Sequence, residues 1–232
     1  MKFHIITIFP EIFDSYFNES IIKRAQEKHQ IIIKIYNLRN WTCDKHKTVD
    51  DAPYGGGAGM VMKIEPLYNA LNDIKSQIIN NKSQINSKKQ DLNIKTILLS
   101  ASGKKWDQQT AQKYSQRLDE IILICGRYEG VDERITHFIN EEISVGDYVL
   151  TGGEIPAMII VDSITRLLPD VLGNNASIME ESHSIPNILE YPQYTRPEIF
   201  KINKKKYPVP PILLSGDHQK IEKWREKNKQ KQ

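Results

Sequence analysis

The stretch Leu-Ile-Cys-Gly-Arg-Tyr-Glu-Gly-Val-Asp-Glu-Arg, residues 123–134, begins in an apolar run and opens into a glycine-rich turn. A second stretch, Ser-Val-Gly-Asp-Tyr-Val-Leu-Thr-Gly-Gly-Glu-Ile-Pro, occupies residues 144–156. Both combine glycines with charged and aromatic residues. Glycine permits positive φ angles and lets a ligand approach main-chain groups closely. These stretches therefore predict loops that hold a small ligand with backbone atoms.

A third glycine-rich stretch, Asp-Asp-Ala-Pro-Tyr-Gly-Gly-Gly-Ala-Gly-Met, occupies residues 50–60. None of the three is a common phosphate-binding loop. A P-loop ends in Gly-Lys-Ser/Thr, which the chain does not contain, and a dinucleotide-binding turn needs a third glycine that residues 57–62 lack. The expected ligand is therefore a small molecule other than a nucleoside polyphosphate.

Hydrophobic patterning predicts an α/β fold. Apolar runs of strand length cover residues 2–9, 31–36, 94–99 and 120–125. Apolar residues recur at helical spacing over residues 12–25, 65–79 and 107–117, and Pro10 suits the first turn of a helix. Strands that alternate with helices indicate a parallel sheet covered on both faces. Residues 126–130 follow a strand, so they should lie at the carboxyl edge, where open α/β sheets bind ligands.

Residues 154–168 form a strongly apolar segment that predicts a helix buried on most sides. In a chain of 232 residues, such a helix suggests a subunit interface. Arg166 interrupts this segment, and burying an arginine is costly unless a carboxylate or a ligand pairs with it. We therefore expect such a partner for Arg166. Towards the C-terminus, residues 169–216 show little periodicity and predict a linker, and Asp217 is positioned to cap a last helix over residues 219–229.

The composition, with 39% hydrophobic and 26% charged residues, is ordinary for a globular protein. Only Cys43 and Cys125 are present, which excludes a disulfide-rich secreted fold, and Cys125 ends an apolar run as a buried thiol would. Because no signal-peptide layout and no apolar run of about 18–20 residues occurs, we expect a cytoplasmic protein without a membrane span. The net charge is +3, and the excess of Lys and Arg over Asp and Glu lies entirely in residues 217–232. This basic segment either attracts phosphates or is a solvated helix end.

These motifs resemble those of bacterial tRNA (guanine-37-N1)-methyltransferases, a family of the SPOUT class. The resemblance runs from Phe9-Pro10 through Thr48-Val49-Asp50-Asp51 to Tyr194-Thr195-Arg196-Pro197 and Leu214-Ser215-Gly216. It covers nearly the whole chain up to about Trp224, with several independent motifs in the family's order. It implies transfer of a methyl group from S-adenosylmethionine to N1 of the guanine on the 3′ side of a tRNA anticodon.

The resemblance also implies the architecture. The expected fold is a SPOUT-type parallel sheet with a deep trefoil knot in residues 98–168, in a homodimer whose active sites are shared between subunits. Residues 1–168 would be the catalytic domain, 169–190 an interdomain linker, and 191–232 a shortened tRNA-binding extension with a short helix. Residues 80–93, rich in Asn, Lys, Gln and Ser, exceed the family's usual length and predict a flexible insertion.

By the same resemblance, S-adenosylmethionine lies among three loops, residues 98–103, 126–130 and 145–156. The implied cofactor-binding residues are Leu99, Ser100, Gly126, Tyr128, Gly130, Val145, Gly146, Tyr148, Leu150, Gly152, Gly153 and Pro156. Their backbone would read the adenine, and the glycines would permit its close approach. The family is Mg²⁺-dependent, but the sequence contains no evident set of metal ligands.

The reaction needs a base, because the N1 of a neutral guanine carries a proton and is a poor nucleophile. A carboxylate within hydrogen-bond reach can remove that proton, and a cation facing O6 stabilises the negative charge that develops there. The resemblance implies that Glu181 is the base, at a position where the family commonly has aspartate. It also implies that Arg166 is the cation and that Glu129 contacts the guanine. The adjacent Glu180 leaves open whether it shares the role of Glu181.

For the tRNA, the resemblance implicates Arg24, Asp50, Tyr54 and Gly59. The lysine-rich residues 201–206 and 220–231 would partly replace contacts of the family's longer last domain. Two alternatives remain open. One is a SPOUT methyltransferase that acts on another RNA site, and the other is a non-catalytic RNA-binding protein built on the same fold. The sequence does not reveal which tRNAs are preferred.

Overall fold

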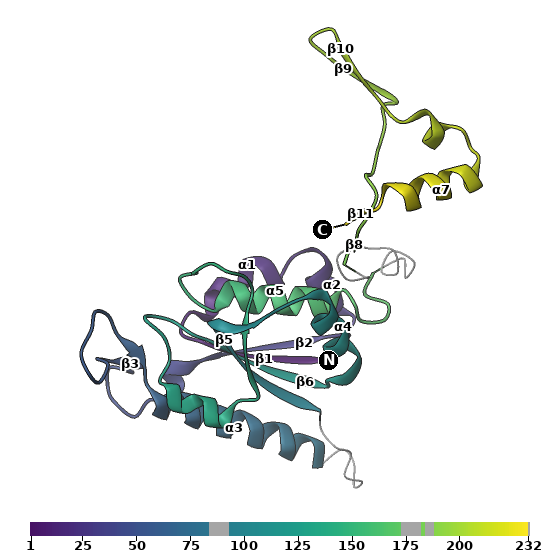
Figure 1. Cartoon of the computed structure of the whole chain (residues 1–232). Helices are drawn as coiled ribbons and strands as arrows, with labels where there is room; N and C mark the ends of the chain where they lie inside the picture. Colours follow the sequence, from purple (N-terminus) through teal and green to yellow (C-terminus); the bar gives the residue numbers. More distant parts are fainter. Residues whose placement is uncertain (84–92, 173–181, 184–187, 232) are drawn as a thin grey trace. The chain divides into compact units, whose positions relative to one another are not determined.

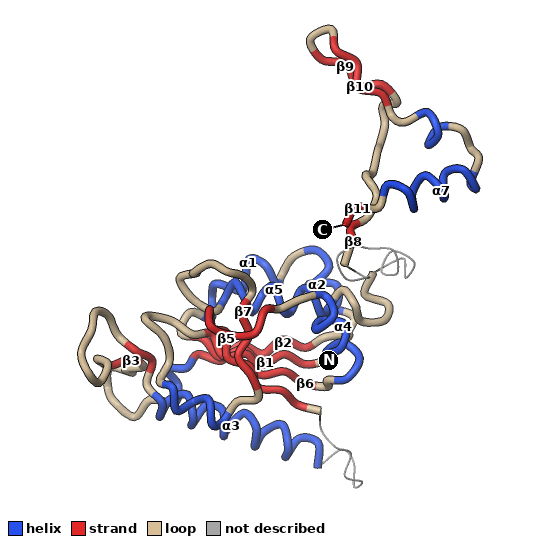
Figure 2. Tube along the Cα trace, viewed as in Figure 1, coloured by secondary structure: helices blue, strands red, loops and turns tan. Residues whose placement is uncertain are grey.

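A computed structural model describes residues 1–83, 93–172, 182–183 and 188–231. The chain divides into two compact units, Met1–Gly173 and Asn174–Gln232. The first unit contains a sheet and its covering helices, and the second contains short strand pairs and a helix (Figures 1 and 2). The predicted base Glu181, its neighbour Glu180 and most of the predicted 80–93 insertion lie outside the described residues.

Five parallel strands form the central sheet in the order β2-β1-β6-β5-β7. They are β1 (Lys2–Thr7), β2 (Ile32–Asn37), β5 (Ile94–Lys105), β6 (Glu120–Cys125) and β7 (Glu141–Ser144). Every residue of β6 is buried, as a parallel strand covered on both faces requires. The prediction of an α/β fold with a parallel sheet is confirmed. So is the buried thiol of Cys125, whose pKa is raised by its burial.

Helices cover both faces of the sheet (Figure 1). On one face, α3 (Ile64–Ser83) packs against alternate residues of β6, Ile122 and Ile124. On the other face, Ile121 and Leu123 pack in a second cluster. That cluster includes residues of α1 (Asp14–Phe17), α2 (Ser20–Glu27), α4 (Gln108–Arg117) and α5 (Glu154–Thr165). The alternation follows from the strand period of two, which sends successive side chains to opposite faces.

Three sequence-based boundaries differ from the structure. The helix predicted over residues 12–25 is divided into η1 (Pro10–Phe13), α1 and α2, and Glu19, between α1 and α2, has extended backbone with a φ of −125° and a ψ of 155°. The helix α3 extends to Ser83, so the first residues of the predicted insertion are helical. The helix α5 ends at Thr165, so Arg166 is its half-buried C-cap rather than an interruption of its interior.

Short elements occur within segments that have no clear period in sequence. Between β2 and α3 lie η2 (Leu38–Trp41) and an antiparallel pair of short strands, β3 (Asp50–Asp51) and β4 (Val61–Met62). This pair closes the glycine-rich stretch into a loop. The helix η3 (Glu133–Phe138) connects β6 to β7. Strand β7 was not predicted, because its sequence Glu-Glu-Ile-Ser is short and contains two acidic residues.

The second unit contains more than the linker and helix that the sequence predicted. Strand β8 (Ile188–Leu189) pairs with β11 (Gln230–Lys231), and β9 (Ile199–Ile202) forms a hairpin with β10 (Lys205–Pro208). The helices η4 (Pro211–Leu214) and α7 (His218–Asn228) follow the hairpin. The side chain of Asp217 accepts a hydrogen bond from the Lys220 backbone N–H at 3.1 Å, so the predicted helix cap is confirmed.

Within the part of the chain that the structure describes, no helix is both long and apolar enough to cross a lipid bilayer.

Candidate active site

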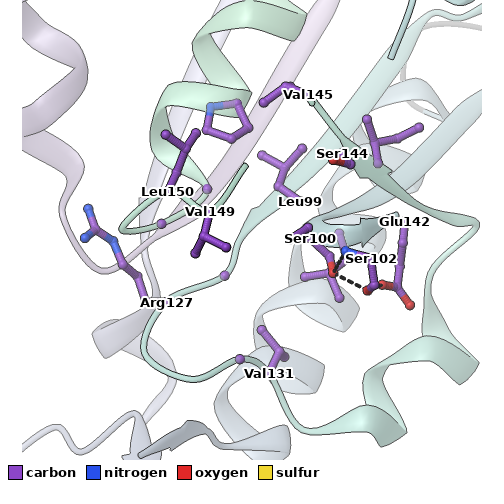
Figure 3. Close-up of a pocket in the computed structure, with 18 of the residues that line it drawn as sticks. Leu99, Ser100, Ser102, Arg127, Val131, Glu142, Ser144, Val145, Val149 and Leu150 are labelled. Carbon is purple, nitrogen blue, oxygen red and sulfur yellow. Dashed lines mark hydrogen bonds between the residues drawn. The ribbon is translucent and has the colours of Figure 1, made fainter. Parts of the chain in front are cut away.

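One cavity lies at the carboxyl edge of the sheet, among three loops (Figure 3). Its volume is about 440 Å³, which is within the range typical of small-molecule sites. The loops follow or interrupt the strands β5, β6 and β7, and the start of α5 completes the wall. Because parallel strands end at one edge, segments far apart in sequence converge there.

Every residue that the sequence assigned to the cofactor lines this cavity, together with Glu129. Residues without a role implied by the sequence also line it, among them Ser102, Arg127, Glu133 and Glu142. Arg127 belongs to the signature stretch and could have been included from the sequence. Glu142 could not, because its place depends on the unpredicted pairing of β7 with β5.

Two glycines show why small residues are needed here. A Cβ on Gly153 would lie 2.6 Å from the Cα of Cys125, so a side chain would push α5 away from the end of β6. The Gly153 N–H donates to the Gly126 carbonyl oxygen at 2.9 Å, which joins the two loops through their backbones. Gly130, with a φ of 145°, has no atom within 4 Å of its added Cβ, so the backbone there is accessible to a ligand.

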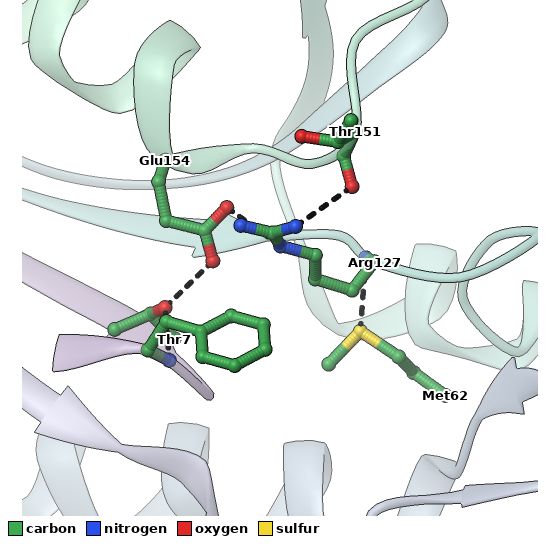
Figure 4. Close-up of polar contacts among 6 residues, drawn as sticks. Thr7, Met62, Arg127, Thr151 and Glu154 are labelled. Atoms are coloured by element: carbon green, nitrogen blue, oxygen red, sulfur yellow. Dashed lines mark hydrogen bonds and ion pairs between the residues drawn. The ribbon is translucent and has the colours of Figure 1, made fainter. Parts of the chain in front are cut away.

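A buried carboxylate holds the loops in place (Figure 4). Glu154, the first residue of α5, is 1% exposed and accepts hydrogen bonds from Thr7 Oγ1 at 2.8 Å and from Arg127 Nε at 2.9 Å. Arg127 Nη1 also donates to the carbonyl oxygen of Thr151 at 3.0 Å. The guanidinium lies 4.6 Å from the ring centroid of Phe9. The side chain of Arg127 therefore joins two of the cavity loops to the first strand and to α5.

The glycine-rich residues 50–62 pack against the loop after β6. The Glu129 N–H donates to the Met60 carbonyl oxygen at 3.0 Å, and the Met62 N–H donates to the Gly130 carbonyl oxygen at 2.9 Å. A Cβ on Gly59 would lie 2.4 Å from Cγ of Glu129, so Gly59 allows the close contact. The predicted substrate residue Gly59 therefore lies directly beside the cavity residue Glu129.

Tyr128 has an unusual backbone for a residue with a side chain, with a φ of 60°. Strained backbone of this kind often occurs at functional sites. Its phenol is partly desolvated and lies near the carboxylate of Asp50, and both effects raise the pKa of Tyr128. The hydroxyl is therefore a neutral hydrogen-bond donor at physiological pH. Asp50, a second predicted substrate residue, is thus close to the cavity wall.

The charged side chains that line the cavity in the described residues are mainly acidic. Glu129, Glu133 and Glu142 are carboxylates, whereas the guanidinium of Arg127 already pairs with Glu154. The Ser102 hydroxyl donates to Glu142 at 3.3 Å, which fixes that carboxylate beside the loop after Leu99. Such a cavity favours a cationic ligand and disfavours a polyphosphate. The lining thus fits S-adenosylmethionine, which carries a positively charged sulfur and a purine that the apolar wall can flank.

Other predicted residues are not brought to this cavity. Arg166 lies ten residues beyond Pro156, about 15 Å along the axis of α5, and lines a separate pocket with Tyr16 and Asp162. There the Tyr16 hydroxyl donates to the Asp162 carboxylate, which raises the pKa of Tyr16 to about 12. Arg24 is exposed on α2, and the side chain of Tyr54 is fully exposed in the glycine-rich loop.

A family model described as tRNA (Guanine-1)-methyltransferase TrmD matches residues 1–232. The chain belongs to this family. Because the family is of the SPOUT class, the five-stranded parallel sheet of the first unit is a SPOUT-type sheet.

Curated proteins with similar sequences bear the same name, "tRNA (guanine-N(1)-)-methyltransferase". The Dictyoglomus turgidum protein is 52% identical over 227 residues, which cover 98% of this chain and 84% of that protein. The Clostridioides difficile protein is 51% identical over 227 residues, or 97% of this chain and 90% of that one. The Bacillus pumilus protein is 47% identical over 228 residues, or 98% and 86%.

The described residues do not form a cluster of metal ligands. Among residues 1–83, 93–172, 182–183 and 188–231, no group of three or more His, Cys, Asp and Glu side chains is arranged to hold a metal ion.

We predict that Arg127→Ala lowers the free energy of unfolding by about 3 kcal/mol or more, because the buried Glu154 carboxylate loses its cation. The double variant Arg127→Ala/Glu154→Gln should recover part of this loss. A neutral amide is less costly to bury, and its oxygen still accepts from Thr7. Urea unfolding of the three proteins measures the difference. Equal stabilities of the single and double variants would contradict the role of the buried charge.

Proposed function

We propose that this chain transfers the methyl group of S-adenosylmethionine to N1 of guanine 37 in tRNA. The observation that carries the proposal is the convergence of the family's signature loops on one mainly acidic cavity. This charge suits a sulfonium compound. The relatives are named for N1 methylation of guanine in tRNA, and position 37 follows from the resemblance of the loops to enzymes that modify that base.

In the proposed reaction, each residue of the site has a separate role. Bound S-adenosylmethionine supplies an electrophilic methyl group. The glycine loops hold the purine through backbone atoms, and Glu129, whose backbone N–H is anchored on Met60, contacts the guanine. Glu181 accepts the N1 proton, and Arg166 faces O6, where negative charge develops. The transfer would leave a neutral methylated base, a protonated Glu181, and S-adenosylhomocysteine, whose sulfur keeps the electrons of the broken bond to the methyl group.

We propose that each active site combines two copies of the chain. Arg166 is about 15 Å along α5 from the cavity wall at Pro156, so it does not line its own chain's cavity. Along the face of α5 that lines the pocket of Arg166, the apolar side chains of Ile155 and Ile159 are 50% and 37% exposed. A second copy that covers this face of α5 would bury them and bring its Arg166 and Glu181 to the cavity of the first.

The remaining assignments are proposals of the same kind. Residues 1–168 would form the catalytic domain, knotted through residues 98–168. Residues 169–190 would link it to a tRNA-binding extension, residues 191–232, and the enzyme would act in the cytoplasm. Dependence on Mg²⁺ carries over from the family and is tested by the methylation rate of the desalted enzyme with and without added Mg²⁺.

The test of the proposed function is methyl transfer to tRNA transcripts. A transcript whose guanine 37 is replaced by adenine should accept no methyl group, whereas replacement of a guanine elsewhere in the anticodon loop should leave transfer intact. Mass mapping of the methylated nucleotide identifies the site. Methylation at another position would favour a different RNA site, and binding of tRNA without any transfer would favour a non-catalytic protein.

We predict that Glu181→Gln lowers the single-turnover rate about 10²–10⁴-fold, because the N1 proton loses its acceptor. Affinity for S-adenosylmethionine should hardly change, and Glu181→Asp should retain much of the activity because the family commonly uses aspartate. Glu180→Gln is the matched control and should be mild. If Glu180→Gln were the damaging change instead, Glu180 would be the base; if both were harmless, the base would lie elsewhere.

We predict that two inactive variants complement each other, one Glu129→Gln and the other Glu181→Gln. After mixing and refolding, half of the dimers are mixed, and each has one site with both carboxylates intact if the sites are shared. Activity should return to about a quarter of the wild-type value. A fully active monomer in sedimentation, or the absence of any recovery in proven mixed dimers, would refute shared sites.

A further inference from the structure

The β9–β10 hairpin of the second unit has well-defined faces. Its turn residues, Asn203 and Lys204, have φ angles of 45° and 64°, which is typical of a type I′ turn. Such a two-residue turn sets the register, in which Phe200 lies opposite Tyr207 and Lys201 lies opposite Lys206. Because side chains alternate along a strand, the aromatic pair and the lysine pair project from opposite faces.

The aromatic pair is open to solvent. Phe200 and Tyr207 are 54% and 52% exposed, and their ring centroids are 6.3 Å apart. Ile202, on the same face, is 48% exposed. The other aromatic residues of this unit form a separate cluster, in which Trp224 packs against Tyr191 and Tyr194. Exposed aromatic rings on a short hairpin are available to stack on a ligand.

The hairpin is also strongly basic. Its lysines are Lys201, Lys204, Lys205 and Lys206, and no acidic residue lies between residues 199 and 208. The ion pairs that the structure describes in this unit lie in α7 and its cap, and none includes a hairpin lysine. Lys201 and Lys206 face each other across the strands, an arrangement of like charges that destabilises a hairpin by itself. A polyanion bound along the hairpin would relieve this repulsion.

We propose that the β9–β10 hairpin binds an unpaired segment of RNA, with a base stacked on Phe200 and Tyr207 and phosphates contacted by the lysines. The proposal rests on the proposed function, which makes tRNA the RNA that the chain meets. A base presents its flat face only when it is unpaired, and stacking on aromatic side chains combined with lysine contacts is how single strands are commonly bound. Lys205 lies two residues from Tyr207 on the same face, about 7 Å away, so one nucleotide can contact both.

The test measures RNA binding by the full-length protein with fluorescence anisotropy, over a range of salt concentrations. The probes are a labelled single-stranded oligoribonucleotide and a blunt duplex of the same length. Phe200→Leu keeps an apolar side chain but removes the ring, so it should weaken single-strand binding about tenfold and duplex binding less than twofold. Lys201→Ala/Lys206→Ala should weaken binding of both probes and reduce the logarithmic salt slope by about 1.4 on the single strand.

Ile199→Ala is the matched control, since Ile199 is 45% exposed on the opposite face of the same strand. It should leave binding unchanged. If Ile199→Ala and Phe200→Leu weakened single-strand binding equally, base stacking on Phe200 would be overturned. The loss of affinity would then reflect unfolding of the hairpin. Binding to phosphatidylserine vesicles is measured with the same variant. If Phe200→Leu weakens vesicle binding but leaves RNA binding intact, the proposal is overturned in favour of a membrane surface.

The same variants separate this proposal from the proposed function. Phe200→Leu should raise the KM for tRNA about tenfold and leave kcat and S-adenosylmethionine affinity unchanged. Unchanged KM in an active enzyme would overturn the hairpin site alone. A wild-type protein that transfers no methyl group but still binds single strands through Phe200 would support the hairpin site and overturn the proposed function alone.

Discussion

The carboxylate of Glu154 is buried at the first residue of α5, between the hydroxyl of Thr7 and the guanidinium of Arg127. A negative charge at a helix N-terminus is favoured by the helix dipole, and its burial is tolerable because both oxygens have donors. These contacts join the end of β1, the loop after β6 and the start of α5. The cavity walls depend on this junction, since the same arginine also holds the carbonyl of Thr151.

The cavity combines two features that suit one kind of ligand. Its glycines bring backbone close to the ligand, which allows an uncharged ring to be held through main-chain atoms. Its charged wall is mainly acidic, and its arginine is already paired. Such a site does not resemble a nucleotide-phosphate site, in which donors and cations face the ligand. The geometry therefore agrees with the family membership on independent physical grounds.

One group proposed for the reaction, Arg166, does not line the cavity of its own chain. It stands at the far end of α5 from the cavity, in a pocket that exposed apolar side chains of the same helix also line. A helix that is apolar on nearly all sides needs cover on more than its sheet-facing side. Formation of a dimer would satisfy this need and complete the site in one step, so that stability of the interface and activity would depend on the same contacts.

Features that depend on near neighbours along the chain could be predicted from the sequence. The apolar runs identified four of the five sheet strands, the glycine-rich stretches identified the cavity loops, and Asp217 identified the start of α7. Contacts between groups that are distant in sequence could not be predicted in this way. The fifth strand β7 pairs with β5 although its own sequence is a poor strand signal, and this pairing places Glu142 beside Ser102. Likewise, Arg127 meets Glu154 and Thr7 only because strand order brings their segments to one edge of the sheet. Hydrophobic periodicity indicates which face of a helix or strand is buried. The energy of a polar contact depends on which other element packs against that face, and the whole fold determines which element this is.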